Sequence, residues 1–101
     1  ARPEPTRDAA RAEAIVRRVL AMLVNEAAEA VHWGLCSAAD VELAMTKGVN
    51  YPRGLLAWGD RLGPAAVVAE LDALRERYQE DRYRVSPLLR RAAAEGGRLA
   101  P

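Results

Sequence analysis

The chain has 101 residues, of which 50% are hydrophobic and 29% are charged, and this is the composition of one globular domain that can bury a core. Its 15 Lys and Arg residues nearly balance its 14 Asp and Glu residues, so the net charge of +1 argues against a nucleic-acid binder and against attachment to an anionic membrane. A single cysteine excludes an intrachain disulfide, and the apolar runs are far shorter than the ~20 residues that span a bilayer, so we expect a cytoplasmic protein.

The first predicted element is a long amphipathic helix from about Thr6 to Trp33. We expect residues 1–11 to form a linker and the start of this helix, with Thr6 as its N-cap. Apolar residues then recur in steps of three and four from Ile15 to Val31, which is the spacing of one broad helical stripe. Such a helix is roughly 40 Å long. It is long for a domain of this size, so something other than this chain is expected to bury part of the stripe.

Four shorter helices are predicted after the first, separated by turn residues. One begins at its N-cap Ser37 and ends at Gly48, and the next spans residues 55–62. The last two begin with Pro64 and Pro87 at their first positions. The residues expected to face inward are Val41, Ala44, Met45, Val67, Val68, Leu71, Leu74 and Tyr78.

The remaining segments are predicted to be irregular. Residues 79–85 are expected to form a polar loop, and residues 99–101 are expected to form a frayed tail. The alternation of period two that is typical of strands does not occur in the sequence. We therefore predict an all-α fold of about five helices.

Sequence signatures of catalysis and of metal binding are absent. A zinc site needs three or four clustered ligands, whereas this chain has one histidine, His32, and one cysteine, Cys36. We expect His32 to pack near the end of the long helix and Cys36 to be a half-buried structural residue. No glycine-rich nucleotide-binding motif is present, so we expect this chain to bind neither a metal nor a cofactor by itself.

Two groups of residues are candidates for binding a substrate or a partner. Arg17 and Arg18 interrupt an apolar stretch of the long helix, and they either lie on a solvated face or contact phosphates or carboxylates. Tyr51, Arg53 and Trp58 lie in and near a loop, and they either pack over the helices or contact a ligand or partner.

Several segments occur in an order that is specific in combination. They are Ile15–Leu20, Asn25–Ala27, Gly34–Ser37 leading to Asp40, Ala44–Gly54, Asp60–Gly63 and Asp81–Leu89. Through these segments, residues 12–98 resemble the C-terminal helical domain of the 3-hydroxyacyl-CoA dehydrogenase family, whose fold is similar to the C-terminal helical domain of 6-phosphogluconate dehydrogenase. Residues 50–54 and 58–63 are most similar to the last domain of bacterial members that carry two such domains in tandem, the 3-hydroxyadipyl-CoA and 3-hydroxybutyryl-CoA dehydrogenases.

The resemblance implies a division of labour between two domains. In this family an N-terminal domain binds NAD and carries a catalytic His–Glu pair, whereas the helical domain closes over the acyl-CoA and forms the dimer. The implied function is that of a dimerisation and substrate-cleft domain of an oxidoreductase that converts 3-hydroxyacyl-CoA to 3-oxoacyl-CoA in fatty-acid or phenylacetate degradation. The chain alone is expected to be inactive.

The sequence departs from the family pattern at a position that bears on catalysis. The first motif in the family usually reads Ile-Val-Asn-Arg, and its Asn contributes to the active site, but Arg17 stands at that position here. No catalytic residue is therefore carried over to this chain. The loss of Asn fits a copy that is retained for structure. Leu55 also replaces a usual proline.

The partners that we expect are a second copy of the chain and an N-terminal nucleotide-binding domain of the same polypeptide. The residues expected to form the dimer core are Val16, Val19, Leu20, Leu23 and Val24. Two alternatives remain. The N-terminal domain, instead of a second copy, covers the surplus stripe, or the chain is a free-standing helical interaction module without enzyme activity. A strand, a glycine-rich motif and a helix upstream of this sequence would favour the enzyme.

Overall fold

The regular structure of the chain is entirely helical over the residues that the structure describes. This computed structural model describes residues 5–48 and 53–100, with side chains from residue 9 onward. The α-helices are α1 (Pro5–His32), α2 (Ala38–Leu43), α3 (Leu55–Leu62), α4 (Pro64–Tyr78) and α5 (Pro87–Glu95). A π-helical segment, Ala44–Gly48, continues α2, and a 3-10 turn, Asp81–Tyr83, precedes α5. No strand occurs within the described ranges, and the predicted all-α fold with one long first helix is confirmed.

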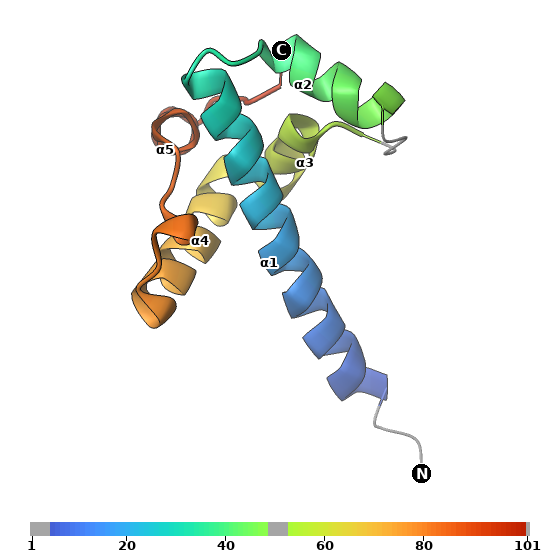
Figure 1. The fold of residues 1–101 in the computed structure, drawn as a ribbon. Coiled ribbons are helices and arrows are strands. Elements are labelled where there is room, and N and C mark those ends of the chain that lie inside the picture. The colour runs from blue at the N-terminus through green and yellow to red at the C-terminus, as the bar shows by residue number, and fades with distance from the viewer. Residues whose placement is uncertain (1–4, 49–52, 101) are drawn as a thin grey trace.

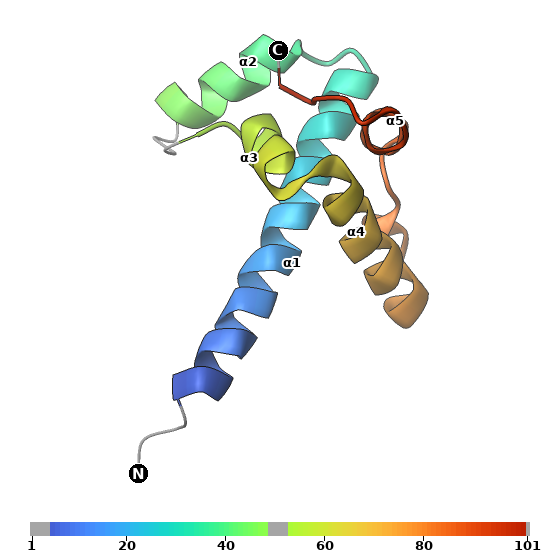
Figure 2. The same cartoon turned by 180° about the vertical axis from the view of Figure 1, so that it is seen from behind.

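Helix α1 is the axis of the molecule, and the other helices cover only part of it. Figures 1 and 2 show α2 to α5 gathered around its C-terminal half, whereas its N-terminal half projects away from them. The molecule is correspondingly elongated, with extents of 51 × 32 × 23 Å. The helix begins at Pro5, so Thr6 lies inside it and is not its N-cap, and the start lies two residues before Arg7, which would follow that cap.

The core forms where small residues of α1 let the other helices approach. Ala21 and Ala28 on α1 are buried, and Leu56, Leu71 and Leu89 bring one large side chain each from α3, α4 and α5. The contact between α1 and α3 is very close, because a Cβ at Gly59 would lie 2.7 Å from Val24 Cγ1 and 2.8 Å from Leu99 Cδ1. A side chain at this position would therefore push the two helices apart.

Local signals set the boundaries of the shorter helices. At the start of α2, the amide of Asp40 donates to Ser37 Oγ (3.0 Å), and the amide of Ser37 donates to Asp40 Oδ2 (3.4 Å). The predicted N-cap is confirmed, and Asp completes the reciprocal cap in place of the commoner Glu or Gln. Helix α3 has the predicted limits, and Pro64 and Pro87 begin α4 and α5 as expected.

Most residues that were predicted to face inward do so, with two exceptions. Val67, Val68 and Leu71 are buried, and Val41, Met45 and Leu74 are half-buried. Ala44 is exposed, and 39% of Tyr78 is exposed. Both lie at the margin of the molecule: Ala44 is where α2 changes to π-helical geometry, and Tyr78 is the last residue of α4.

The segments that were predicted to be a polar loop and a frayed tail each bring a residue into the core, which corrects both predictions at these residues. Tyr83, in the segment predicted as a polar loop, has no exposed surface. In the predicted tail, Leu99 is buried, and the amides of Leu99 and Ala100 donate to the carboxylate of Asp60 at 2.6 and 2.9 Å. The carboxylate of α3 thus holds the end of the chain against the body, an interaction that local sequence does not reveal.

Candidate functional site: a cavity beside the projecting helix

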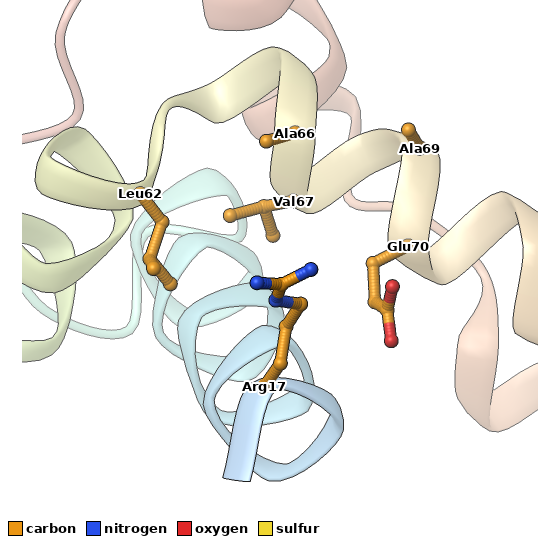
Figure 3. A pocket seen from close by; sticks show the side chains of 6 residues that line it. All are labelled: Arg17, Leu62, Ala66, Val67, Ala69 and Glu70. Atoms are coloured by element: carbon orange, nitrogen blue, oxygen red, sulfur yellow. The ribbon is translucent and has the colours of Figure 1, made fainter. Parts of the chain in front are cut away.

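An open cavity of about 450 Å³ lies where α1 passes the junction of α3 and α4. Its lining residues are Arg17, Leu62, Ala66, Val67, Ala69 and Glu70. Figure 3 shows the guanidinium of Arg17 reaching from α1 toward Val67, with Leu62 on one side and Glu70 on the other. The cavity therefore combines a largely alkyl wall with one cationic and one anionic side chain.

Helical geometry explains why Arg17 faces the cavity. Residues four and seven positions apart lie on the same face of a helix, and Arg17 precedes Ala21 by four residues and Val24 by seven. Both Ala21 and Val24 are buried against the body. Arg17 lies on the same face one turn earlier, where α1 leaves the body, so its side chain meets the start of α4 instead of the core.

The guanidinium of Arg17 has a weakly held partner. Its Nη2 atom lies 3.3 Å from Glu13 Oε1, one turn earlier on α1, and the two side chains are 59% and 72% exposed. An exposed ion pair of this kind contributes only about 0.3–0.5 kcal/mol. Among the described residues, Glu13 is the ionic partner of Arg17, although Glu70 lines the same cavity. A ligand that offers a better acceptor can displace such a partner.

Arg18 has a different environment from its neighbour. It donates a hydrogen bond to the hydroxyl of the buried Tyr83, and this bond raises the pKa of Arg18 above its ordinary value. Its guanidinium carbon also lies 5.0 Å from the ring centroid of Tyr78 and 5.5 Å from that of Tyr83. Arg18 thus joins α1 to the 3-10 turn, and the two candidate arginines do not act on one site.

Of the loop candidates, Arg53 and Trp58 do not line the cavity. Trp58 is half-buried and packs against the core, and the guanidinium carbon of Arg53 lies 5.2 Å from its ring centroid. Tyr51 lies outside the described residues. The residues that sequence reasoning missed in the cavity are Leu62, Ala66, Val67, Ala69 and Glu70. No sequence signal points to them, because they come from α3 and α4 and meet Arg17 only through packing.

The candidates for the dimer core divide into exposed and buried residues. Val16 and Val19, which flank the middle of α1, are 55% and 48% exposed, whereas Leu20 and Leu23 are half-buried. Val24 has no exposed surface, so its place among these candidates is corrected: it belongs to the core of the chain itself. Ile15, which was not among the candidates, is 57% exposed and adjoins Val16 and Val19.

Asn25 joins two of the segments that carry the sequence resemblance. It is 3% exposed; its Nδ2 donates to the carbonyl of Arg84 (2.8 Å), and its Oδ1 accepts from the amide of Ser86 (2.7 Å). These bonds pair backbone groups in the turn before α5 that would otherwise be left unpaired inside the molecule. Asn25 therefore has a structural role.

The other chemistry-bearing residues do not form a second site. His32 is half-buried, with its ring meeting Trp33 edge to face at a centroid distance of 5.3 Å, and Cys36 is half-buried. Within residues 5–48 and 53–100, no three His, Cys, Asp or Glu side chains are grouped so that they could hold a metal ion. Over the same ranges, none of the helices has the length and apolar character that crossing a membrane requires.

Comparison with known proteins gives concordant relationships. The family described as 3-hydroxyacyl-CoA dehydrogenase, C-terminal domain, matches residues 15–99. The chain is 45% identical over 84 residues to 3-hydroxyadipyl-CoA dehydrogenase of Escherichia coli K12, and the matched segment covers 82% of this chain and 18% of that protein. It is 35% identical over 75 residues to 3-hydroxybutyryl-CoA dehydrogenase of Clostridioides difficile, and this match covers 74% of this chain and 27% of that protein.

Solved structures agree with these relationships. The crystal structure of 3-hydroxybutyryl-CoA dehydrogenase from Escherichia coli K12 superposes with a TM-score of 0.75 at 45% identity, over 77% of this chain and 16% of that one. The (S)-3-hydroxybutyryl-CoA dehydrogenase of Ralstonia eutropha superposes with a TM-score of 0.74 at 32% identity, over 78% and 28%. The chain thus spans less than a third of the length of the relatives that it matches.

Proposed function

The chain belongs to the 3-hydroxyacyl-CoA dehydrogenase family as a C-terminal helical domain, and on this premise we propose that it forms one wall of an acyl-CoA cleft and a dimer surface in an NAD-dependent enzyme. The whole enzyme oxidises a 3-hydroxyacyl-CoA to the 3-oxoacyl-CoA in the cytoplasm. The observation that carries the proposal is the cavity at Arg17. The position at which the family motif usually places an active-site Asn opens onto this cavity.

The cofactor belongs to another part of the polypeptide in this proposal. When bound, NAD accepts the hydride from the 3-hydroxyl carbon. This sequence holds neither a glycine-rich nucleotide-binding motif nor a catalytic His–Glu pair, so its residues bind and orient the acyl chain and exclude water. The 101-residue chain by itself is therefore inactive.

The names of the relatives leave two substrate classes open. One is 3-hydroxybutyryl-CoA, whose acyl chain ends in a methyl group. The other is 3-hydroxyadipyl-CoA, whose acyl chain ends in a second carboxylate. Both are 3-hydroxyacyl thioesters, so the proposed reaction is the same for both.

The projecting half of α1 supports the proposed dimer. Ile15, Val16 and Val19 are each about half exposed on a helix whose opposite face is already packed against the body. A second copy of the same surface buries these side chains through twofold symmetry. Interfaces of standard size remove roughly 1,600 Å² of surface from water. Two projecting helices that pack side by side contribute to this area along their exposed faces.

A chimaera tests the dehydrogenase assignment. The segment of the Escherichia coli 3-hydroxyadipyl-CoA dehydrogenase that matches this chain is replaced by residues 15–99, and NADH formation from 3-hydroxyacyl-CoA is followed at 340 nm. We expect turnover within about tenfold of the parent enzyme, because the replaced part shares its fold. A chimaera that folds and binds NAD but forms no NADH contradicts the proposal and favours the free-standing interaction module.

Sedimentation equilibrium at micromolar concentrations tests the dimer. We expect the 101-residue chain to be a dimer and the double variant Val16→Asp, Val19→Asp to be a monomer of unchanged helicity. Leu35→Asp is the matched control, because Leu35 is 79% exposed but lies beyond the C-terminal end of α1. A monomeric parent chain contradicts the proposed dimer and favours burial of this face by the N-terminal domain.

A further inference from the structure

Helix α1 carries an apolar row, Ile15, Val19 and Met22, on the side that faces away from the other helices. Because each residue of a helix is rotated by about 100° from the one before, these three side chains point in similar directions, roughly opposite to the buried Val24. Ile15 and Val19 are 57% and 48% exposed, and Met22 is half-buried. Helix α1 passes in front of α3 and α4 in Figure 1 and behind them in Figure 2, so these helices lie on one side of it.

Two opposite charges lie at the ends of this row. Arg11 lies one turn before Ile15, and Glu26 lies one turn after Met22. Both charged side chains are exposed, and neither is in an ion pair with another described residue. Arg11 and Glu26 are about 22 Å apart along the helix, at 1.5 Å per residue, so they do not meet within one chain.

The order of these residues is self-complementary in an antiparallel pair of helices. When two copies of α1 run in opposite directions about a twofold axis beside Val19, each residue faces the one at the same distance on the other side of the axis. Ile15 of one copy then faces Met22 of the other, and Arg11 of one copy faces Glu26 of the other. A parallel pair in register instead brings like charges together, which is unfavourable.

Resting on the proposed dimer, we propose that a second copy of this chain covers the apolar row in antiparallel orientation, with an Arg11–Glu26 ion pair at each end of the contact. The axis of this arrangement passes the middle of α1 (Pro5–His32), so the two helices overlap along their length. The apolar residues contribute most of the affinity, because burial of hydrocarbon is the main favourable term in association. The ion pairs select the direction and the register, since other arrangements lose them or juxtapose like charges.

Charge reversal and its rescue test the register. Glu26→Arg and Arg11→Glu each create like-charged pairs at both ends of the contact. We therefore expect either change to raise the dissociation constant of the dimer about tenfold in sedimentation equilibrium. The double variant Glu26→Arg, Arg11→Glu is expected to return the constant to within about threefold of the parent. Because the two residues do not meet within one chain, such a rescue reports a contact between two copies.

The control for charge reversal lies on another helix. Glu95 is exposed at the end of α5, so Glu95→Arg changes the net charge as Glu26→Arg does but leaves α1 unaltered. We expect its dissociation constant to equal that of the parent chain. Circular dichroism verifies that every variant keeps its helicity.

Cross-linking tests the orientation independently of charge. In a Cys36→Ser background, Val19→Cys places the thiols of two copies beside the axis, where their Cα atoms approach the separation of about 4.4–6.8 Å that a disulfide spans. Ala12→Cys is the matched control. Its two copies are about 20 Å apart along an antiparallel pair but face each other in a parallel one. We expect oxidation to produce covalent dimers of the first variant and not of the second.

The outcomes separate this inference from the proposed function. A dimer that responds to neither single reversal, or that the double variant does not rescue, overturns the Arg11–Glu26 register and leaves the proposed dimer standing. Cross-linking of Ala12→Cys as readily as Val19→Cys overturns the antiparallel orientation. A monomeric parent chain contradicts the proposed dimer together with this inference and favours coverage of the row by the N-terminal domain. None of these measurements involves turnover, so the chimaera tests the dehydrogenase assignment separately.

Discussion

The two halves of α1 have the same regular structure but different surroundings. In the C-terminal half, Ala21, Val24 and Ala28 are buried, and the other helices pack around them. In the N-terminal half, Ile15 and Val16 are about half exposed, and the helix projects from the body. The difference shows that helix formation and burial are separate matters. An apolar stripe predicts a helix, but which part of the stripe is covered depends on how far the rest of the chain extends.

The projecting half also separates the two proposed functions by direction. Arg17 faces the body side and lines the cavity, whereas the exposed Val19 lies two residues further on, about 200° around the helix. One turn of α1 therefore presents a cavity residue to one side and the proposed partner surface to the other. A partner on the exposed face leaves the cavity open on the body side.

The largest expected effect is on the free energy of unfolding, and it differs between the two halves of α1. Val24→Asp places a carboxylate in the core without a partner, which costs several kcal/mol, and we expect the domain to unfold because total stabilities are only about 5–15 kcal/mol. Val16→Asp is the matched change on the projecting half, and at protein concentrations at which both chains are monomeric it is expected to alter the free energy of unfolding by less than about 0.5 kcal/mol. Urea titrations followed by circular dichroism measure both. A folded Val24→Asp variant contradicts the division of α1.

Features that depend on neighbouring residues could be predicted from the sequence, whereas features that depend on contacts between distant residues could not. Helix α3 has the predicted limits because Gly54 and Gly63 lie at its ends, and the Ser37 N-cap was predictable for the same local reason. The burial of Tyr83 was not predictable. It lies in a polar segment, and its hydroxyl contacts Arg18, which is 65 residues away along the chain.

The candidate site shows the same limit. Arg17 was a candidate from its place in the helical stripe and from its departure from the family motif. Glu70 and Leu62 were not, because their approach to Arg17 follows from the packing of α3 and α4 beside α1, and nothing in their local sequence sets them apart. Val24 was predicted to lie in the dimer core because the apolar stripe of the first helix covers more than one of its sides. Periodicity alone does not say which side packs against the rest of the chain.

The end of the chain provides a second, smaller contrast with the projecting helix. Residues 99 and 100 are not helical, yet the carboxylate of Asp60 accepts hydrogen bonds from both of their amides. Removing the carboxylate in Asp60→Ala is expected to lower the free energy of unfolding by about 2 kcal/mol, since hydrogen bonds to a charged group contribute about 1.5–3 kcal/mol. Hydrogen exchange is expected to accelerate at the amides of Leu99 and Ala100. Unchanged protection at these amides would show that burial of Leu99 alone holds the tail.

Arg18 lies at the boundary between the two halves of α1, and its replacement is expected to have a still smaller effect. Arg18→Met loses the hydrogen bond to Tyr83 and the contact with the ring of Tyr78, so amides in residues 81–83 are expected to exchange faster. Arg17→Met is the matched control, because its exposed pair with Glu13 contributes little. The same exchange rates at residues 81–83 in both variants would contradict a tether at Arg18.

The smallest expected effect is the pH dependence of this tether. The hydrogen bond to Tyr83 raises the pKa of Arg18 above its ordinary value. A cation with a raised pKa in the folded state stabilises fully below the unfolded-state pKa, and this stabilisation is lost only as the pH rises through the folded-state value. Between pH 6 and 9 the difference in urea midpoint between the parent chain and Arg18→Met is therefore expected to stay constant. A difference that shrinks toward pH 9 would mean that the junction between the two halves of α1 is held by a group that titrates in this range, and the tether would have to be assigned to that group instead of to Arg18.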